Sequence, residues 1–251
     1  MTFKYDGSFE GFLTAVFSAY EFKCKNCTIV KENEHVESLF EETEEVITSE
    51  EKANRVWKKI QEKTGAKGSR QIYWAFLSEL FGVENTLFQY IQHAINSTKN
   101  ITTDYTNQAV LGVSQIVKKV GREKHRMDAF VRFRKTKDNI YFSTIEPDFN
   151  VLPLNAKHFK NRYADQHWCI YDLKRNYGIY YDLNSVEIIQ LELPSSILNT
   201  STDFFTAEEM QFQQLWKNYF DSTNIKSRKN TKLHQKHVPK RYWKYLSEKY
   251  L

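Results

Sequence analysis

A stretch in the second half of the chain, residues 158–183, gathers side chains that could do chemistry. It holds seven aromatic rings, two histidines and three aspartates among several Lys and Arg. His158, Arg162 and Asp165 are spaced i, i+4 and i+7, so on a helix they would share one face. A histidine near an aspartate can act as a general base, whereas an ion-paired helix surface is the alternative. His158, Asp165 and Asp172 are therefore our candidate acids or bases.

Aromatic rings form the second candidate group, because an unstacked nucleobase can stack on an exposed ring. Strand side chains alternate between two faces, so the rings of this stretch cannot all lie on one surface. Some of them must belong to the core. The candidates for base stacking are Trp168, Tyr177, Tyr180, Tyr181 and Tyr242.

The end of the chain is strongly basic although the formal net charge of the protein is only +5. Residues 224–251 carry nine Lys or Arg against one acid, whereas residues 31–51 carry nine Glu against one Lys. A basic segment interleaved with aromatic residues is typical of nucleic-acid binding. The alternative is that its rings only dock a final helix onto the core. Our candidate DNA-binding residues are Arg162, Asn224, Lys226, Arg228, Lys229, Asn230, Lys232, Lys240 and Arg241.

Signals for metal or cofactor chemistry are weak. Cys24 and Cys27 form a CxxC pair, but the sequence has no second pair to complete a zinc site. Acids around the predicted strand ends, such as Glu146 and Asp148, match no nuclease spacing. No GxSxG, P-loop, GxGxxG or HExxH motif occurs. We expect neither a metal nor a cofactor.

The elements that must position these residues differ between the two halves. Apolar residues recur at helical spacing in the first half, and Gly65, Gly68, Gly82 and Gly121 lie between or beyond the segments. The predicted helices cover residues 9–20, 53–64, 69–81, 84–97 and 103–120. From about Met127 the period becomes two, which predicts strands.

The second half reads β-β-α-β-β-β. A hairpin turns at residues 137–139, a short helix follows Pro153, and three strands cover residues 168–172, 177–183 and 186–193. A helix beginning at Thr206, with a capping-box match at Glu209, and a last helix after Pro239 follow. Short connections predict an antiparallel sheet. We expect an α+β protein with a helical part, residues 1–125, and a sheet part, residues 126–251, or one compact domain.

Composition predicts a soluble protein. No apolar run approaches the roughly 18 residues of a membrane span, and the first residues lack a signal peptide's charged start and apolar core. Three cysteines cannot form a disulfide framework and an odd count is typical of a reducing compartment. We expect a cytoplasmic protein without membrane contact.

Three blocks of the chain resemble a bacterial family of DNA-repair and DNA-metabolism proteins. They are YDGSFEGFLTAVFSAYE, EPDFNVLPLNAKHFKNRYADQHWCIYDLKRNYGIYYD and LWKNYFDSTNIKSRKNTKLHQKHVPKRYWKYLSEK. The resemblance spans nearly the whole chain and is weak at residues 31–51. Members are encoded beside a radical-SAM protein of DNA modification or repair and occur fused to uracil-DNA-glycosylase-like domains. The family is a domain of unknown function without assigned catalytic residues.

The resemblance implies two partners, DNA and the radical-SAM protein, which carries its own cofactors. Three functions stay open at this point. The first is a DNA-binding accessory protein for base repair or modification. The second is an enzyme on DNA, a glycosylase or nuclease, that uses His158, Asp165 or Asp172. The third is a protein-interaction module for the radical-SAM neighbour, and whether the chain is an enzyme is left undecided.

Overall fold

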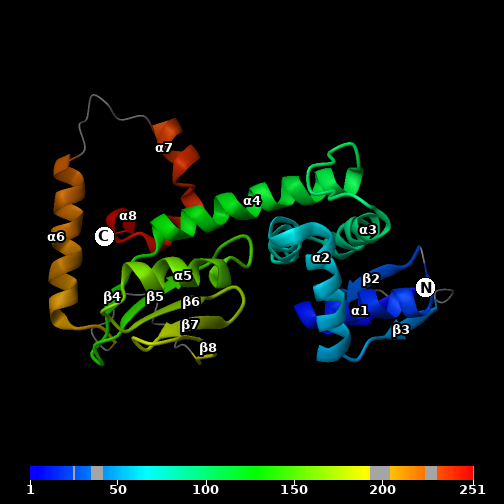
Figure 1. The fold of residues 1–251 in the computed structure, drawn as a ribbon. Coiled ribbons are helices and arrows are strands. Elements are labelled where there is room, and N and C mark those ends of the chain that lie inside the picture. Colours follow the sequence, from blue (N-terminus) through cyan, green and yellow to red (C-terminus); the bar gives the residue numbers. More distant parts are fainter. Residues whose placement is uncertain (25, 35–41, 193–203, 224–230, 251) are drawn as a thin grey trace. The chain divides into compact units, whose positions relative to one another are not determined.

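The structure, a computed structural model, describes residues 1–24, 26–34, 42–192, 204–223 and 231–250 (Figure 1). The chain divides into two compact units, Met1–Gly121 and Arg122–Leu251, here called unit 1 and unit 2. Helix α4, Gln108–Phe130, contributes residues to both. The predicted α+β class is confirmed, whereas the predicted division into two domains stays a prediction. No helix among the described residues is long and apolar enough to cross a membrane.

Unit 1 contains a small parallel sheet that the sequence analysis did not predict. Its strands are β1 (Thr2–Tyr5), β2 (Thr28–Lys31) and β3 (Thr43–Glu45), with β1 in the centre. Each strand has only three or four residues, too few to establish an alternating pattern. Phe3 and Tyr5 of β1 are buried in the core. A short 3-10 turn, η1 (Glu32–Glu34), follows β2.

The helices of unit 1 surround this sheet with an aromatic core. Helix α1 (Phe9–Glu21) begins as predicted, because the Ser8 side chain accepts a hydrogen bond from the Gly11 N–H, 2.9 Å. Phe9 contacts rings of Trp57 and Phe76 from α2, with centroids 5.3 and 5.1 Å away. Helices α2 and α3 span Glu50–Phe76 and Val83–Asn96.

Three glycines, Gly65, Gly68 and Gly121, lie inside helices and do not separate them as the sequence predicted. Gly65 kinks α2 with φ 65° and ψ −173°, a conformation open essentially to glycine alone, yet helix resumes directly after it. Gly121 lies inside α4, which continues to Phe130. The predicted helices 53–64 and 69–81 are thus one kinked helix, and α4 runs ten residues further than expected.

Unit 2 is built on a five-stranded sheet in sequence order. The strands are β4 (Arg134–Lys135), β5 (Tyr141–Ile145), β6 (Trp168–Asp172), β7 (Tyr177–Tyr181) and β8 (Val186–Ile189). The β4–β5 hairpin is confirmed, with Asn139 at φ 59° in its turn. The prediction of a fully antiparallel sheet was wrong. Strands β5 and β6 are parallel, because α5 (Leu152–Arg162) forms a crossover connection between them.

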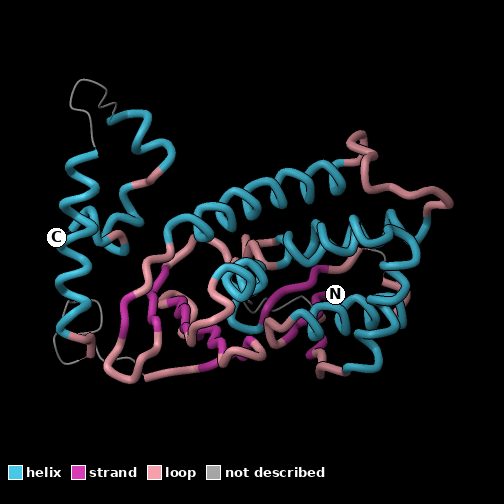
Figure 2. The backbone as a smooth tube through the Cα atoms, turned by 60° about the vertical axis from the view of Figure 1, so that its left-hand side comes forward, coloured by secondary structure: helices cyan, strands magenta, loops and turns pink. Residues whose placement is uncertain are grey.

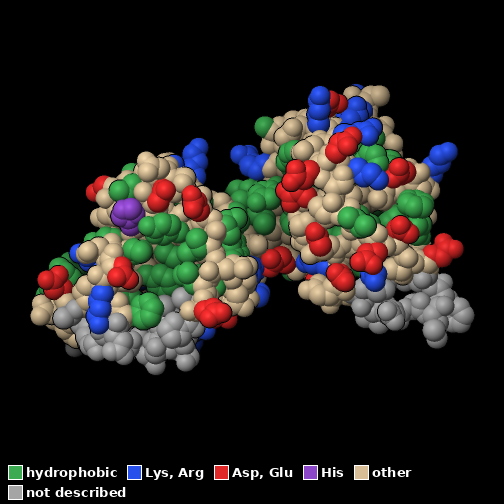
Figure 3. Space-filling view, turned by 90° about the horizontal axis from the view of Figure 1, so that it is seen from below, with side chains coloured by type: hydrophobic (Ala, Val, Ile, Leu, Met, Phe, Trp, Pro, Cys, Tyr) green, Lys and Arg blue, Asp and Glu red, His purple; other side chains and the backbone are tan. Residues whose placement is uncertain are grey.

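The two faces of this sheet are both apolar. On one face Phe159 of α5 packs against Trp168, with ring centroids 6.1 Å apart. On the other face Phe142, Cys169 and Tyr171 form a buried cluster. Figure 3 shows the molecule from below, and hydrophobic side chains gather on the visible surface of unit 2, the left-hand body. Residues of β6 are buried along its whole length.

The C-terminal elements are α6 (Ala207–Thr223), α7 (Thr231–His237), the 3-10 helix η4 (Lys240–Tyr245) and α8 (Ser247–Tyr250). Figures 1 and 2 show α6 along one edge of unit 2, where it contacts α8. The predicted last helix after Pro239 is a 3-10 helix followed by one α-turn. Helix α7 was not expected.

Candidate functional site

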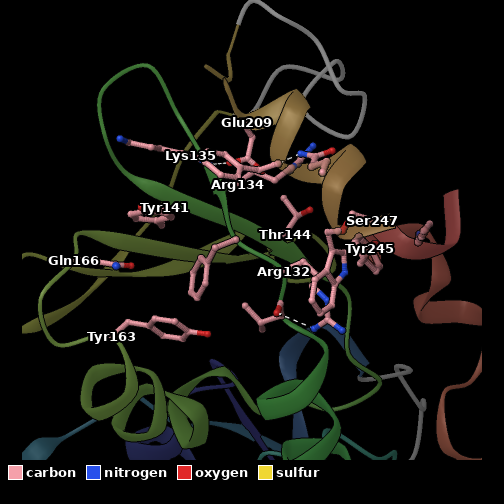
Figure 4. Close-up of a pocket in the computed structure, with 16 residues that line it drawn as sticks. Arg132, Arg134, Lys135, Tyr141, Thr144, Tyr163, Gln166, Glu209, Tyr245 and Ser247 are labelled. Carbon is pink, nitrogen blue, oxygen red and sulfur yellow. Dashed lines mark hydrogen bonds between the residues drawn. The ribbon is translucent and has the colours of Figure 1, made fainter. Parts of the chain in front are cut away.

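A cavity lined by aromatic and charged side chains lies within unit 2 and has a volume of about 610 Å³. Its walls come from the α4–β4 junction, β4, β5, the α5–β6 turn, α6, η4 and α8 (Figure 4). We call this cavity the unit 2 pocket. Its lining residues are Val131, Arg132, Phe133, Arg134, Lys135, Tyr141, Thr144, Tyr163, Gln166, Glu209, Phe212, Gln213, Trp216, Lys244, Tyr245 and Ser247.

Six of these side chains are aromatic, and they come from five parts of the unit. The Phe133 ring meets the Tyr163 ring edge-on at a centroid distance of 5.2 Å. Phe212 and Trp216, one turn apart on α6, are 63% and 42% exposed although they line a cavity. Because an exposed ring face gains most from a stacked ligand, these two are the rings best placed to bind one.

Arg132 and Lys244, two of the cations that line the pocket, are paired with acids. Arg132 holds Glu248 with two hydrogen bonds, from Nη2 to Oε1 at 2.8 Å and from Nε to Oε2 at 3.3 Å. Lys244 lies 2.5 Å from a Glu146 oxygen. The Arg134 guanidinium stacks on Phe205 at 4.0 Å. Among the described residues, the Lys135 ammonium has no ion-pair partner, so it is the cation best able to meet a phosphate.

These contacts also set the titration of the two paired acids. Burial raises the pKa of Glu248, but bonds from Arg132, its own backbone and Trp216 bring that pKa below its usual value. Hydrogen bonds from Lys244 and Tyr245 lower the pKa of Glu146. Burial, followed by the bond to Glu146, raises the pKa of Tyr245. Both acids are therefore anionic at neutral pH and neutralise cations that line the pocket.

Helix α6 is fixed to the sheet by Glu209. The Thr206 hydroxyl accepts from the Glu209 N–H at 3.3 Å, which is one half of the predicted capping box. The Glu209 side chain does not return to Thr206; its Oε2 accepts from the Lys135 N–H at 3.0 Å. Its Oε1 accepts from Gln213 Nε2 at 3.1 Å. Glu209 thus ties α6 to β4 and has both oxygens occupied.

The predicted acid and base residues are not brought together. Helix α5 ends at Arg162, so Asp165 lies in the following turn and does not share a helix face with His158. All three side chains are exposed, and no hydrogen bond or ion pair joins them among the described residues. The one-face arrangement was wrong, because the i+7 position falls beyond the helix end.

The surroundings of Asp172 indicate a structural role. It is fully buried on β6, and its Oδ2 accepts from Arg175 Nη1 at 2.8 Å. Burial raises the pKa of Asp172, while the Arg175 charge opposes the rise. Arg175 also donates to the Pro147 carbonyl at 3.2 Å. The pair therefore joins the β6–β7 turn to the loop after β5, and Asp172 does not line the unit 2 pocket.

Three of the five predicted stacking residues are core side chains. Trp168, Tyr181 and Tyr242 are at most 3% exposed, which leaves no ring face for a base. Tyr177 and Tyr180 are half-buried, and their hydroxyls bond to Asn150 and His167. The predicted stacking role is corrected for the three buried rings. Strand alternation and burial on both sheet faces explain the error.

The predicted DNA-binding residues divide into two groups. Asn224, Lys226, Arg228, Lys229 and Asn230 lie outside the described residues. In the described part, Lys232 and Lys240 are exposed. Arg241 is ion-paired with Asp148 at 2.6 Å and lies 3.6 Å from Glu123. Its charge is thus used within the unit, whereas Lys232 and Lys240 face solvent.

Metal ligands do not cluster in the described part of the chain, where no group of three His, Cys, Asp or Glu could hold an ion. Cys24 and Cys27 are half-buried thiols. Burial, and then the neighbouring Cys24, raises the pKa of Cys27 to about 11. This pKa disfavours the thiolate at neutral pH, the form that binds metals and attacks disulfides.

Sequence reasoning missed most of the pocket. Gln166 and Tyr163 lie inside the stretch 158–183, but the candidate residues predicted there were their neighbours. Phe212, Leu215, Trp216 and Tyr219 follow i, i+3, i+4 and i+7 along α6 and all are at least 42% exposed. The sequence contains this helical spacing, but spacing alone does not distinguish an exposed apolar stripe from a buried one.

One family model matches the chain, the domain of unknown function DUF4130, over residues 82–248. Neither a curated protein nor a solved structure matches. The matched segment covers about two thirds of the chain and includes every residue that lines the unit 2 pocket. The chain therefore belongs to the DUF4130 family.

Proposed function

We propose that the protein binds DNA through unit 2 and holds one unstacked base in the unit 2 pocket. It would act as an accessory protein of base repair or modification. The observation that carries this proposal is the pocket itself, with six aromatic rings around a cavity of about 610 Å³. Pockets of about 300–1,000 Å³ suit small ligands, and a nucleobase needs an unstacked position to enter one.

The charge distribution supports DNA as the ligand whose base enters the pocket. Unit 2 has 22 Lys and Arg against 15 Asp and Glu, a formal charge of +7, whereas unit 1 has 14 against 16, or −2. Cations that meet phosphates release counterions and supply salt-sensitive affinity. Lys135 at the pocket and the exposed Arg162, Lys232 and Lys240 are among the described cations available for this contact.

The proposed partner is the radical-SAM protein that the sequence resemblance implies. It would carry out the chemistry with its own cofactors, and the present chain would present the base. Its pocket has aromatic walls and a buried carboxylate, Glu209, whose oxygens are both hydrogen-bonded inside the protein. This arrangement favours holding a base over attacking it.

The test is fluorescence anisotropy of labelled single-stranded, mismatched and matched duplex DNA at 50 and 200 mM salt. We expect affinity to fall more than about tenfold over this range. We expect the matched duplex to bind most weakly, because its bases must first unstack. Salt-insensitive binding, or no binding to any of the three, would contradict the proposal.

A pair of Phe→Ala variants locates the site. Phe212→Ala removes a pocket ring, and we expect DNA affinity to fall about 5- to 100-fold, the range for one stacked base. Phe81 in unit 1 is 87% exposed and lies outside the pocket, so Phe81→Ala is the matched control. Equal DNA affinities of the two variants would indicate that DNA binds outside the pocket.

A second function, protein interaction, is favoured by α6. Leu215 and Tyr219 extend the apolar stripe beyond the pocket and are 62% and 60% exposed. We propose that this stripe contacts the radical-SAM partner, and Leu215→Lys should then abolish co-purification of the two proteins after nuclease treatment. Co-purification that nuclease abolishes would instead indicate a DNA bridge.

A further inference from the structure

We propose that the unit 2 pocket selects adenine and that Gln166 is the residue that selects it. The inference rests on the proposed function, because it names the base that the pocket would hold. It begins with polar groups on the pocket wall that the protein itself does not use.

Gln166 lies in the turn between α5 and β6 and is half-buried at the wall of the pocket. Its carboxamide makes no hydrogen bond to any residue in the part of the chain that the structure describes. Figure 4 shows the amide near Tyr141 and Tyr163, with the Tyr163 hydroxyl pointing into the pocket. Neither of these two hydroxyls has a hydrogen-bond partner among the described residues. One wall of the pocket therefore offers donors and acceptors to a ligand.

The chemistry of a carboxamide fits one base edge in particular. It presents an oxygen acceptor next to an N–H donor. Adenine presents the N6 amino donor next to the N7 acceptor, and Gln or Asn pairs with these two groups through two hydrogen bonds. The rings of Tyr141 and Tyr163 flank the amide and can contact the edges of a purine.

Several of the side chains that could recognise guanine or cytosine are already bound to other residues of the protein. Guanine is read by Arg or Lys, but Arg132 and Lys244 bind Glu248 and Glu146. The cytosine amino group is read by Asp or Glu, but both oxygens of Glu209 accept bonds from the protein. The Arg134 guanidinium stacks on Phe205, and we assign the Lys135 ammonium to a phosphate. The carboxamide of Gln166 is therefore the group that we assign to a base edge.

Adenine could reach the pocket from two sources, an unstacked deoxyadenosine in DNA or a free adenosine nucleotide. The test therefore uses a nine-nucleotide strand of abasic spacers that carries one central base, and adenosine monophosphate as a competitor. The central base is adenine, purine without the N6 amino group, or 7-deazaadenine without the N7 acceptor. Anisotropy gives the affinity of each.

We expect the wild type to bind the adenine strand roughly 5- to 100-fold more tightly than either analogue. Gln166→Met keeps the side-chain length but removes both polar atoms, and it should bind all three strands equally. Gln211→Met is the matched control, because Gln211 is exposed on α6 and does not line the pocket. Thermal unfolding of both variants should match the wild type.

The outcomes separate this inference from the proposed function. Strand binding without adenine preference, or a preference that survives Gln166→Met, overturns the adenine inference and leaves DNA binding standing. If adenosine monophosphate binds in a Gln166-dependent way and no strand binds, the adenine site stands and the DNA function fails. If neither ligand binds, both are wrong.

Discussion

The Glu248 side chain on α8 accepts hydrogen bonds from two other parts of unit 2, the α4–β4 junction and α6. Arg132, in the junction between α4 and β4, donates to both of its oxygens, and Trp216 of α6 donates from Nε1 to Oε2 at 3.1 Å. The carboxylate is only 6% exposed. We expect Glu248→Gln to lower the free energy of unfolding by about 1–3 kcal/mol at pH 7, because a cation loses its charged acceptor.

The same residue gives a pH dependence with a defined sign. The pKa of Glu248 is lower in the folded protein than its usual value, so its stabilising contribution is complete above the unfolded-state pKa. The contribution is lost as the pH falls through the folded pKa. Urea unfolding at pH 7 and pH 4 should therefore show a larger loss for the wild type than for Glu248→Gln. Equal losses would mean that the pairing contributes nothing.

Residue types alone identified some of the chemistry but not its surroundings. The sequence pointed to Trp168 and Asp172, and both are fully buried. A ring or an acid looks the same in a sequence whether it faces solvent or the core. Gln166 was overlooked, since a glutamine in a turn carries no motif. Its candidacy depends on an unused carboxamide at a cavity wall, which only coordinates reveal.

At the scale of elements, α6 shapes the pocket through its attachment to β4. Glu209 accepts from the Lys135 N–H, and its own N–H bonds Thr206. We expect Glu209→Ala to speed amide hydrogen exchange across residues 207–217, because α6 loses its bond to β4 and the side-chain bond between residues 209 and 213 within the helix.

Glu208→Ala is the control for that measurement. Glu208 lies in the same first turn and interacts with the same helix dipole, but its side chain is exposed. Exchange that rises equally in the two variants would show that helix electrostatics, and not the Glu209 bonds, hold α6. DNA affinity should fall with Glu209→Ala alone, because Phe212 and Trp216 depend on the position of α6.

Elements in stretches with a clear alternating or helical pattern, bounded by turn residues, were predictable, whereas the strands of unit 1 were not. The β4–β5 hairpin, α5 and strands β6 to β8 lie close to their predicted positions. The parallel sheet of unit 1 was missed because its strands are three or four residues long. The direction of β6 was wrong because alternation gives a strand but not its partner's orientation. That orientation follows from the crossover through α5.

At the scale of the whole chain, charge and cavity point to the same unit. Unit 2 carries the formal charge of +7, the pocket and residues 122–248 of the matched family segment. Composition predicted the basic C-terminal region, but not that Arg241 and Lys244 would pair with Asp148 and Glu146. These acids lie about a hundred positions earlier in the sequence, so their pairing depends on tertiary structure.

The central claim is that a single base enters the unit 2 pocket, and photo-crosslinking tests it most directly. A single-stranded oligonucleotide with one photoreactive 8-azidoadenine is irradiated with the protein, and the crosslinked peptides are mapped by mass spectrometry. We predict crosslinks to pocket rings within residues 133–141, 163–166 and 212–216. Crosslinks confined to unit 1, or to parts of unit 2 outside the pocket, would contradict the account.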